Sequence, residues 1–199
     1  MPPESEKTPV ILYIHGFNSS PLSQKAKSFS AWCKNHGHIK VLVPELSYDP
    51  AQAISQLEAL INNHLDSMRL LVGSSLGGYY ATYLCEKYDL KGVLINPAVS
   101  PCKTLGKEFL GLQKNYYSGK EYELTMEHVN YLATLDVNSL QSPANYFLLV
   151  QTGDEVLDYQ LAVEKYKGAR QEIQQRGSHS FDNFEAVIPD IIDFAGFTK

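Results

Sequence analysis

Residues 72–79 read Val-Gly-Ser-Ser-Leu-Gly-Gly-Tyr and contain the pattern Gly-x-Ser-x-Gly, with Ser75 at its centre. An apolar run of strand length at residues 69–72 leads into the pattern, and a stretch that can form a helix follows it. This context of strand, sharp turn and helix is typical of a nucleophile elbow, which exposes a reactive serine. So tight a turn has no room for a Cβ two residues before or after the serine. The pattern therefore predicts Ser75 as a nucleophile, with Gly73 and Gly77 supporting the turn.

Two other interpretations of this turn are less well supported. If Ser74 were the nucleophile, Val72 and Leu76 would occupy the flanking positions, where a side chain fits badly. A glycine-rich connection between strand and helix can also bind phosphate at the helix N-terminus. Neither Gly-x-Gly-x-x-Gly nor Gly-Lys-Ser/Thr accompanies the turn, so phosphate binding lacks its motif.

Length and composition indicate one globular domain. The chain has 199 residues, enough to bury a sizeable core, with hydrophobic and charged fractions ordinary for a soluble protein. A net charge of -5 without basic runs argues against a nucleic-acid or anionic-membrane partner. Cys33, Cys85 and Cys102 lack metal-type spacing and are expected to be free thiols. The first apolar run, residues 10–14, is too short for a signal peptide or membrane span, so the predicted location is the cytoplasm.

Short apolar runs alternate with amphipathic stretches along the chain, which indicates βαβ units. We therefore predict an α/β protein with a six-stranded, mostly parallel sheet and helices on both faces. The last run is more polar than the others, as expected at a sheet edge. The predicted strands occupy residues 10–14, 39–43, 69–72, 92–96, 146–151 and 171–174. The predicted helices occupy residues 22–35, 50–65, 79–87, 157–167 and 183–195, with Asp49 as the N-cap of the second.

The alternation breaks between residues 97 and 142, a stretch rich in glycine and tyrosine. A segment this long between two strands is usually functional, and it would lie at the carboxyl ends of the strands, where such sheets bind ligands. We predict a single domain over residues 1–199 with a small, partly helical lid at about 101–142 above Ser75. The alternative is a segment that only covers the sheet, with its tyrosines as half-buried packing.

A serine hydroxyl becomes a nucleophile when a base lies within hydrogen-bond reach and an acid orients that base. Asp154 closely follows the run at 146–151, and His179 lies in a loop before the last predicted helix. The order serine, acid, histidine differs from the orders of chymotrypsin-like and subtilisin-like enzymes. We therefore predict a catalytic triad of Ser75, Asp154 and His179, and we assign the competing Asp158 to the start of the following helix.

Acyl transfer builds negative charge on the carbonyl oxygen of the substrate, which fixed backbone N–H groups stabilise. The expected donors are the N–H groups of Leu76 and Phe17, with His15 and Gly16 shaping the loop of the second donor. No pair of histidines has metal-ligand spacing with a third ligand nearby. The sequence therefore predicts neither a metal nor another cofactor.

Four phrases carry a resemblance to a known family. They are His-Gly-Phe-Asn-Ser-Ser-Pro from His15, Gly-Ser-Ser-Leu-Gly-Gly-Tyr-Tyr-Ala from Gly73, Asn-Pro-Ala from Asn96 and Thr-Gly-Asp-Glu-Val-Leu-Asp-Tyr from Thr152. With Gly-Ser-His ending at His179, the chain resembles the α/β-hydrolase superfamily over nearly its whole length, and within it the small bacterial esterases of the YqiA family.

The resemblance implies hydrolysis of carboxylic esters, with Ser75, Asp154 and His179 on the family's triad. It also implies a reduced α/β-hydrolase fold, without the two antiparallel strands that open the full-length version. The three-glycine oxyanion motif of some lipases is missing, because Phe17 follows His15 and Gly16.

The predicted function is hydrolysis of small or short-chain esters through an acyl-enzyme on Ser75, with a small-molecule ester as the partner. The same residues would serve a thioester or an amide. A binding module with an idle triad is an alternative from another class, because fold does not determine function. A nucleotide-binding domain is less well supported, since the dinucleotide motif is missing. The oligomeric state stays open.

Overall fold

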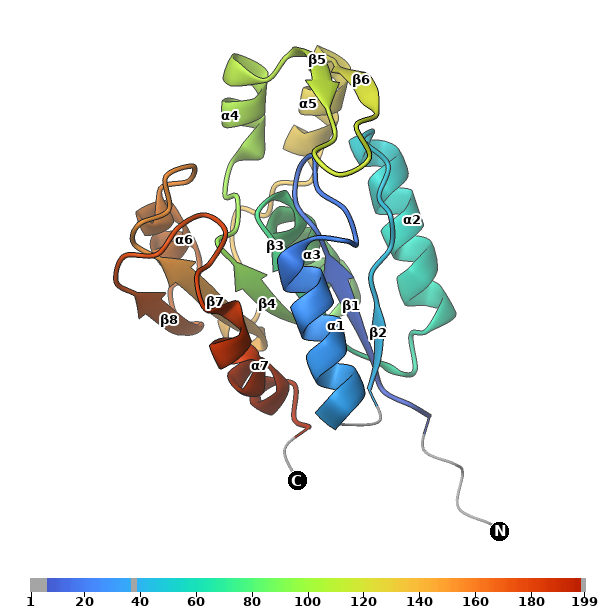
Figure 1. The fold of residues 1–199 in the computed structure, drawn as a ribbon, viewed down its shortest axis with the longest axis vertical. Coiled ribbons are helices and arrows are strands. Elements are labelled where there is room, and N and C mark those ends of the chain that lie inside the picture. The colour runs from blue at the N-terminus through green and yellow to red at the C-terminus, as the bar shows by residue number, and fades with distance from the viewer. Residues whose placement is uncertain (1–6, 37–38, 198–199) are drawn as a thin grey trace.

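A central six-stranded sheet organises the chain (Figure 1). The computed structural model describes residues 7–36 and 39–197. Neighbouring strands pair in parallel throughout this sheet, in the order β2-β1-β3-β4-β7-β8. Both the predicted fold class and the edge position of the last strand are confirmed. The strands are β1 (Val10–Ile14), β2 (Lys40–Leu42), β3 (Met68–Ser74), β4 (Lys91–Ile95), β7 (Tyr146–Gln151) and β8 (Arg170–Gln174).

Helices cover both faces of the sheet and create two apolar cores (Figure 1). Side chains alternate across β1, so Ile11 and Tyr13 belong to one core while Leu12 and Ile14 belong to the other. One face packs against α1 (Gln24–His36), the 3₁₀ turn η2 (Phe184–Val187) and α7 (Ile188–Phe194). The opposite face packs against α2 (Pro50–Asn63), α3 (Leu76–Tyr88) and α6 (Tyr159–Lys165).

Local capping explains where several helices begin. Asp49 caps α2, because its Oδ1 accepts from the N–H of Ala51 at 2.8 Å and proline occupies the first turn. Asp158 caps α6 by accepting from the N–H of Gln160 at 2.9 Å, as the sequence predicted. The helix expected over 183–195 instead begins as the 3₁₀ turn η2 and becomes α-helical at Ile188.

The strand order reverses between β1 and β3, since β2 extends the sheet on one side and all later strands extend it on the other. In such sheets the carboxyl ends of the strands at the reversal form a ligand-binding crevice. The register pairs Ile14 with Gly73, and Gly73 with Leu94. The loops after β1, β3 and β4 therefore begin side by side at one edge.

Between β4 and β7 the chain builds a small cap over that edge (Figure 1). It comprises α4 (Pro101–Glu108), β5 (Gly111–Lys114), β6 (Glu121–Leu124) and α5 (Met126–Thr134), followed by the 3₁₀ turn η1 (Pro143–Asn145). The antiparallel β5–β6 hairpin was not predicted. Asn115 explains its turn, because its Oδ1 accepts from the N–H groups of Tyr117 and Ser118, both at 2.9 Å. A lid function for this cap stays a prediction.

Candidate active site

Ser75 occupies a strained turn between β3 and α3. Its φ of 55° and ψ of -122° lie where non-glycine residues are seldom found. Four backbone hydrogen bonds of 2.9–3.4 Å hold the turn. The N–H of Ser75 donates to the carbonyl of Ile95, and the carbonyl of Ser75 accepts from the N–H groups of Gly78, Tyr79 and Ala98. This conformation lifts the hydroxyl away from the sheet, as in a nucleophile elbow.

Gly73 and Gly77 lie where a side chain has no space. A Cβ on Gly73 would collide with the carbonyl oxygen of Gly77, and a Cβ on Gly77 would collide with the carbonyl oxygen of Ile14. The steric reason inferred from the sequence pattern therefore corresponds to particular backbone contacts across the turn.

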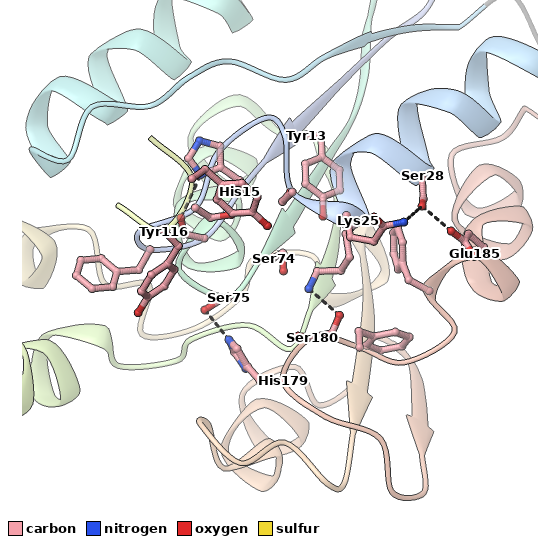
Figure 2. Close-up of a pocket in the computed structure, with 18 of the residues that line it drawn as sticks. Tyr13, His15, Lys25, Ser28, Ser74, Ser75, Tyr116, His179, Ser180 and Glu185 are labelled. Carbon is pink, nitrogen blue, oxygen red and sulfur yellow. Dashed lines mark hydrogen bonds between the residues drawn. The ribbon is translucent and has the colours of Figure 1, made fainter. Parts of the chain in front are cut away.

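The structure brings Ser75, His179 and Asp154 into one chain of hydrogen bonds. The distance between Ser75 Oγ and His179 Nε2 is 3.1 Å (Figure 2), and His179 Nδ1 lies 2.8 Å and 3.0 Å from the two carboxylate oxygens of Asp154. A carboxylate only accepts, so Nδ1 carries the proton and Nε2 accepts from the serine hydroxyl. This tautomer places a base against the hydroxyl.

Asp154 is held as a charged group. Its side chain is only 2% exposed, and its Oδ1 accepts from the N–H groups of Val156 at 2.9 Å and Leu157 at 2.8 Å. Burial by itself raises the pKa of Asp154, but the hydrogen bond from His179 and those from the backbone outweigh burial and lower that pKa. The carboxylate can thus orient the imidazole and stabilise its protonated form.

Two buried amides that the sequence interpretation missed position the loop of His179. Asn96, at the end of β4, donates through Nδ2 to the carbonyls of Ser178 at 3.0 Å and His179 at 3.2 Å. Its Oδ1 accepts from the N–H of Gln151 at 3.0 Å. The φ of Asn96 is 41°, a conformation that asparagine tolerates better than most residues.

Gln151, at the end of β7, has a buried side chain with four hydrogen bonds. Its Oε1 accepts from the N–H groups of Ser178 at 3.1 Å and Asp182 at 2.8 Å. Its Nε2 donates to the carbonyl of Asp182 at 2.9 Å and to Gln174 at 2.8 Å. The sequence does contain a signal for both residues, because Asn96 and Gln151 are amides at the end of otherwise apolar runs.

The loop after β1 lies directly against the serine. A Cβ on Gly16 would lie 3.1 Å from Ser75 Cβ and 3.6 Å from Ser75 Oγ. Within the loops and turns of the described chain, the N–H groups of Phe17 and Leu76 donate to no protein acceptor. Both residues line a cavity together with Ser75. Their donors are thus available to a substrate.

His15 is brought near the site but not into the hydrogen-bond chain. It is 5% exposed, and its Nδ1 donates to the carbonyl of Gly16 at 3.1 Å. Burial lowers the pKa of His15, which favours the neutral ring. These contacts suit the predicted role in shaping the loop.

Two cavities meet at Ser75 and Phe17, which line both. The polar cavity, of about 490 Å³, is defined here by Lys25, Ser28, Tyr116, His179, Ser180 and Glu185 (Figure 2). The apolar cavity, of about 860 Å³, is defined by Ala98, Val99, Leu105, Phe109, Leu140 and Leu157. The cap contributes to both, through Tyr116 in the first and Leu105 and Phe109 in the second.

Asn18 connects the loop that carries Phe17 to the cap through hydrogen bonds. Its Oδ1 accepts from the hydroxyl of Tyr122 at 2.6 Å, and its carbonyl accepts from the N–H of Tyr116 at 3.0 Å. The ring of Phe17 meets that of Phe109 edge to face at 5.8 Å. The position of the loop therefore depends on the cap.

Two kinds of feature are missing from the part of the chain that the structure describes. No group of three or more His, Cys, Asp or Glu side chains is arranged to hold a metal ion there. None of the helices in residues 7–36 and 39–197 is long and apolar enough to cross a membrane.

Comparison with protein families assigns the chain. The model of the uncharacterised protein family UPF0227 matches residues 10–196, nearly the full length. The chain belongs to this family. The resemblance to α/β-hydrolases that was inferred from the sequence is supported at the level of the fold by solved structures.

Solved structures share the fold of this UPF0227 protein at low sequence identity. Est1E from Butyrivibrio proteoclasticus with bound ferulic acid has a TM-score of 0.72 and 16% identity, over 96% of this chain and 89% of its own. The esterase domain of a Rhodothermus marinus protein has a TM-score of 0.71 and 16% identity, over 96% and 88%. A monoacylglycerol lipase from Paleococcus ferrophilus has a TM-score of 0.68 and 17% identity, over 96% of both chains. These similarities show the α/β-hydrolase fold.

Proposed function

We propose that this protein is a serine hydrolase that cleaves carboxylic esters through an acyl-enzyme on Ser75. The observation that carries the proposal is the hydrogen-bond chain from Ser75 through His179 to the buried Asp154. This arrangement supports the roles of Ser75 as nucleophile, His179 as base and Asp154 as orienting acid in acyl transfer. That structural neighbours are named as an esterase or a lipase adds support for an ester as the substrate.

The reaction follows from this geometry in two halves. His179 Nε2 takes the proton of Ser75 as Oγ attacks the ester carbonyl, and Asp154 stabilises the imidazolium. The N–H groups of Phe17 and Leu76 stabilise the oxyanion, and His179 returns the proton to the leaving alcohol. Water activated by the same histidine then hydrolyses the acyl-enzyme.

The apolar cavity sets a limit on the size of the acyl group. The short-chain acyl group predicted from the sequence fits the apolar cavity, whose volume of about 860 Å³ also has room for longer chains. The cap over residues 101–142 would act as a lid that closes both cavities around such an ester.

The decisive experiment is labelling with a fluorophosphonate probe, followed by intact mass. We expect one adduct on the wild-type chain and none on Ser75→Ala, because the probe reacts with serines activated by a base. Ser74→Ala is the matched control and should keep the adduct, since Ser74 belongs to β3 and is 6% exposed. A folded wild-type chain that takes up no probe would contradict the proposal and favour a binding module.

Hydrolysis assays then separate the candidate substrates. Ser75→Ala should lose turnover of para-nitrophenyl butyrate, and a matched thioester and anilide would rank the alternatives. If the thioester were hydrolysed faster than the ester after correction for their intrinsic reactivities, the protein would be a thioesterase and the ester proposal would be wrong.

A further inference from the structure

The two cavities differ in their position relative to His179, the proposed general base. His179 lines the polar cavity and is not part of the wall of the apolar one, whereas Leu76 lines only the apolar one. The group that protonates a leaving alcohol must contact the oxygen of that alcohol. The alcohol part of an ester therefore lies in the polar cavity, and the acyl part lies in the apolar cavity.

Lys25 is the cation of the polar cavity. It extends from α1 toward the loop of His179, where its Nζ donates to the carbonyl of Ser180 at 2.8 Å (Figure 2). Among the described residues, no carboxylate forms an ion pair with Lys25. An ammonium group has three donors, so a single carbonyl leaves hydrogen-bonding capacity for a ligand.

The Lys25 side chain is half-buried, so its charge is only partly desolvated. Burial lowers the pKa of Lys25 to about 8, while the charge of Asp154 acts in the opposite direction. The side chain is still mostly protonated at neutral pH, because neutral pH lies below this pKa. An anion bound beside the ammonium would offset the cost of its burial.

The wall of the polar cavity also carries a carboxylate, that of Glu185, whose Oε1 accepts from the hydroxyl of Ser28 at 2.5 Å. This carboxylate would repel a doubly charged phosphate more strongly than a monoanion. A ligand with a single negative charge therefore suits the cavity better than a phosphate.

We propose that the polar cavity binds an alcohol part that carries a carboxylate, recognised by Lys25, while the apolar cavity binds the acyl part. The substrate class is thus an ester between an apolar acid and an acidic alcohol. This inference rests on the proposed function, because the orientation depends on His179 acting on the leaving alcohol.

The test compares two butyrate esters of similar size, para-carboxyphenyl butyrate and para-carbamoylphenyl butyrate, which differ in charge. The readout is the ratio of their kcat/KM values, so the intrinsic reactivity of the esters cancels between enzyme variants. We expect Lys25→Met to lower this ratio about 10-fold, the scale of one hydrogen bond to a charged group. Lys25→Arg should retain most of the ratio, since it keeps the charge.

Lys27→Met is the matched control, because Lys27 lies exposed on the same helix outside the cavity and should leave the ratio unchanged. A ratio that Lys25→Met does not alter would overturn the inference, even if both rates fell together, because a merely structural role moves both esters alike. If the wild type hydrolyses neither ester and Ser75 takes up no fluorophosphonate, the proposed function fails and the inference fails with it.

Discussion

At the scale of single residues, the site depends on positions where a Cβ is missing. Gly73 and Gly77 allow close backbone contacts around the turn at Ser75. Gly16 allows the loop after β1 to lie against Ser75. In the proposed mechanism, Phe17 stabilises the oxyanion through its backbone N–H, whichever side chain the residue carries. Backbone geometry at this point therefore matters more than side-chain identity.

A pair of substitutions tests this point. Gly16→Ala should lower kcat/KM for para-nitrophenyl butyrate about 10- to 100-fold, because the new Cβ would lie 3.1 Å from Ser75 Cβ and displace the oxyanion donor. Phe17→Ala should cost less than about 10-fold, since the N–H remains. Steady-state kinetics with active-site titration would measure both, and a larger loss in Phe17→Ala would show that the ring itself is required.

At the scale of elements, the ends of β4 and β7 hold the loop that carries His179. Asn96 and Gln151 close these strands and bind the backbone of residues 178–182 through their side chains. A loop tied in this way keeps the imidazole within reach of Ser75. If His179 is the base, its preorganisation comes from the neighbouring strands rather than from the loop itself.

Gln151→Met keeps the length of this side chain but removes its four hydrogen bonds. We expect a loss of about 2–4 kcal/mol in the free energy of unfolding, because the N–H groups of Ser178 and Asp182 lose their acceptor. We also expect a lower kcat with KM little changed. Urea denaturation and kinetics measure the two effects.

Gln160→Met is the control, since Gln160 is exposed at the start of α6. It should change stability by less than about 0.5 kcal/mol. Full kcat in a folded Gln151→Met variant would show that the loop positions His179 without this amide.

At the scale of the whole molecule, the cap and the sheet together create two cavities of different character around one nucleophile. The cap contacts the loop of Phe17 through Asn18 and Phe109, so the segment that shapes the cavities also supports the loop that carries the proposed oxyanion donor. In the proposed mechanism, one insertion would therefore influence both substrate selection and the chemical step.

The apolar cavity predicts a dependence on acyl chain length. For para-nitrophenyl esters, kcat/KM should rise from acetate to longer chains by about two- to fourfold per methylene until the cavity is filled. Val99→Phe should shift the preferred chain toward shorter acids, because Val99 lines this cavity. Leu22→Phe is the control, because Leu22 is 60% exposed and lines neither cavity. A rate independent of chain length would place the acyl group elsewhere.

Much of the fold and part of the candidate site could be predicted because the signals are local. Apolar runs of strand length predicted five strands of the main sheet, and a shorter, more polar run predicted the sixth at the edge. Asp49 and Asp158 were recognised at the starts of their helices. The order of Ser75, Asp154 and His179 predicted residues that the fold brings together. Their catalytic roles stay predictions until the labelling experiment is done.

The sequence by itself determined the main helices and strands, the elbow at Ser75 and the glycines that permit the elbow. These features depend on steric contacts between neighbouring residues and on the spacing of apolar side chains along the chain. Only the tertiary structure decided the amide supports of Asn96 and Gln151 and the place of Lys25 in the polar cavity. These features depend on partners far apart in the chain: Asn96 and His179 are separated by 83 residues, and Lys25 and Ser180 by 155. A buried amide or lysine has many possible partners in the sequence, and packing selects one because an unpaired polar group inside the fold is costly.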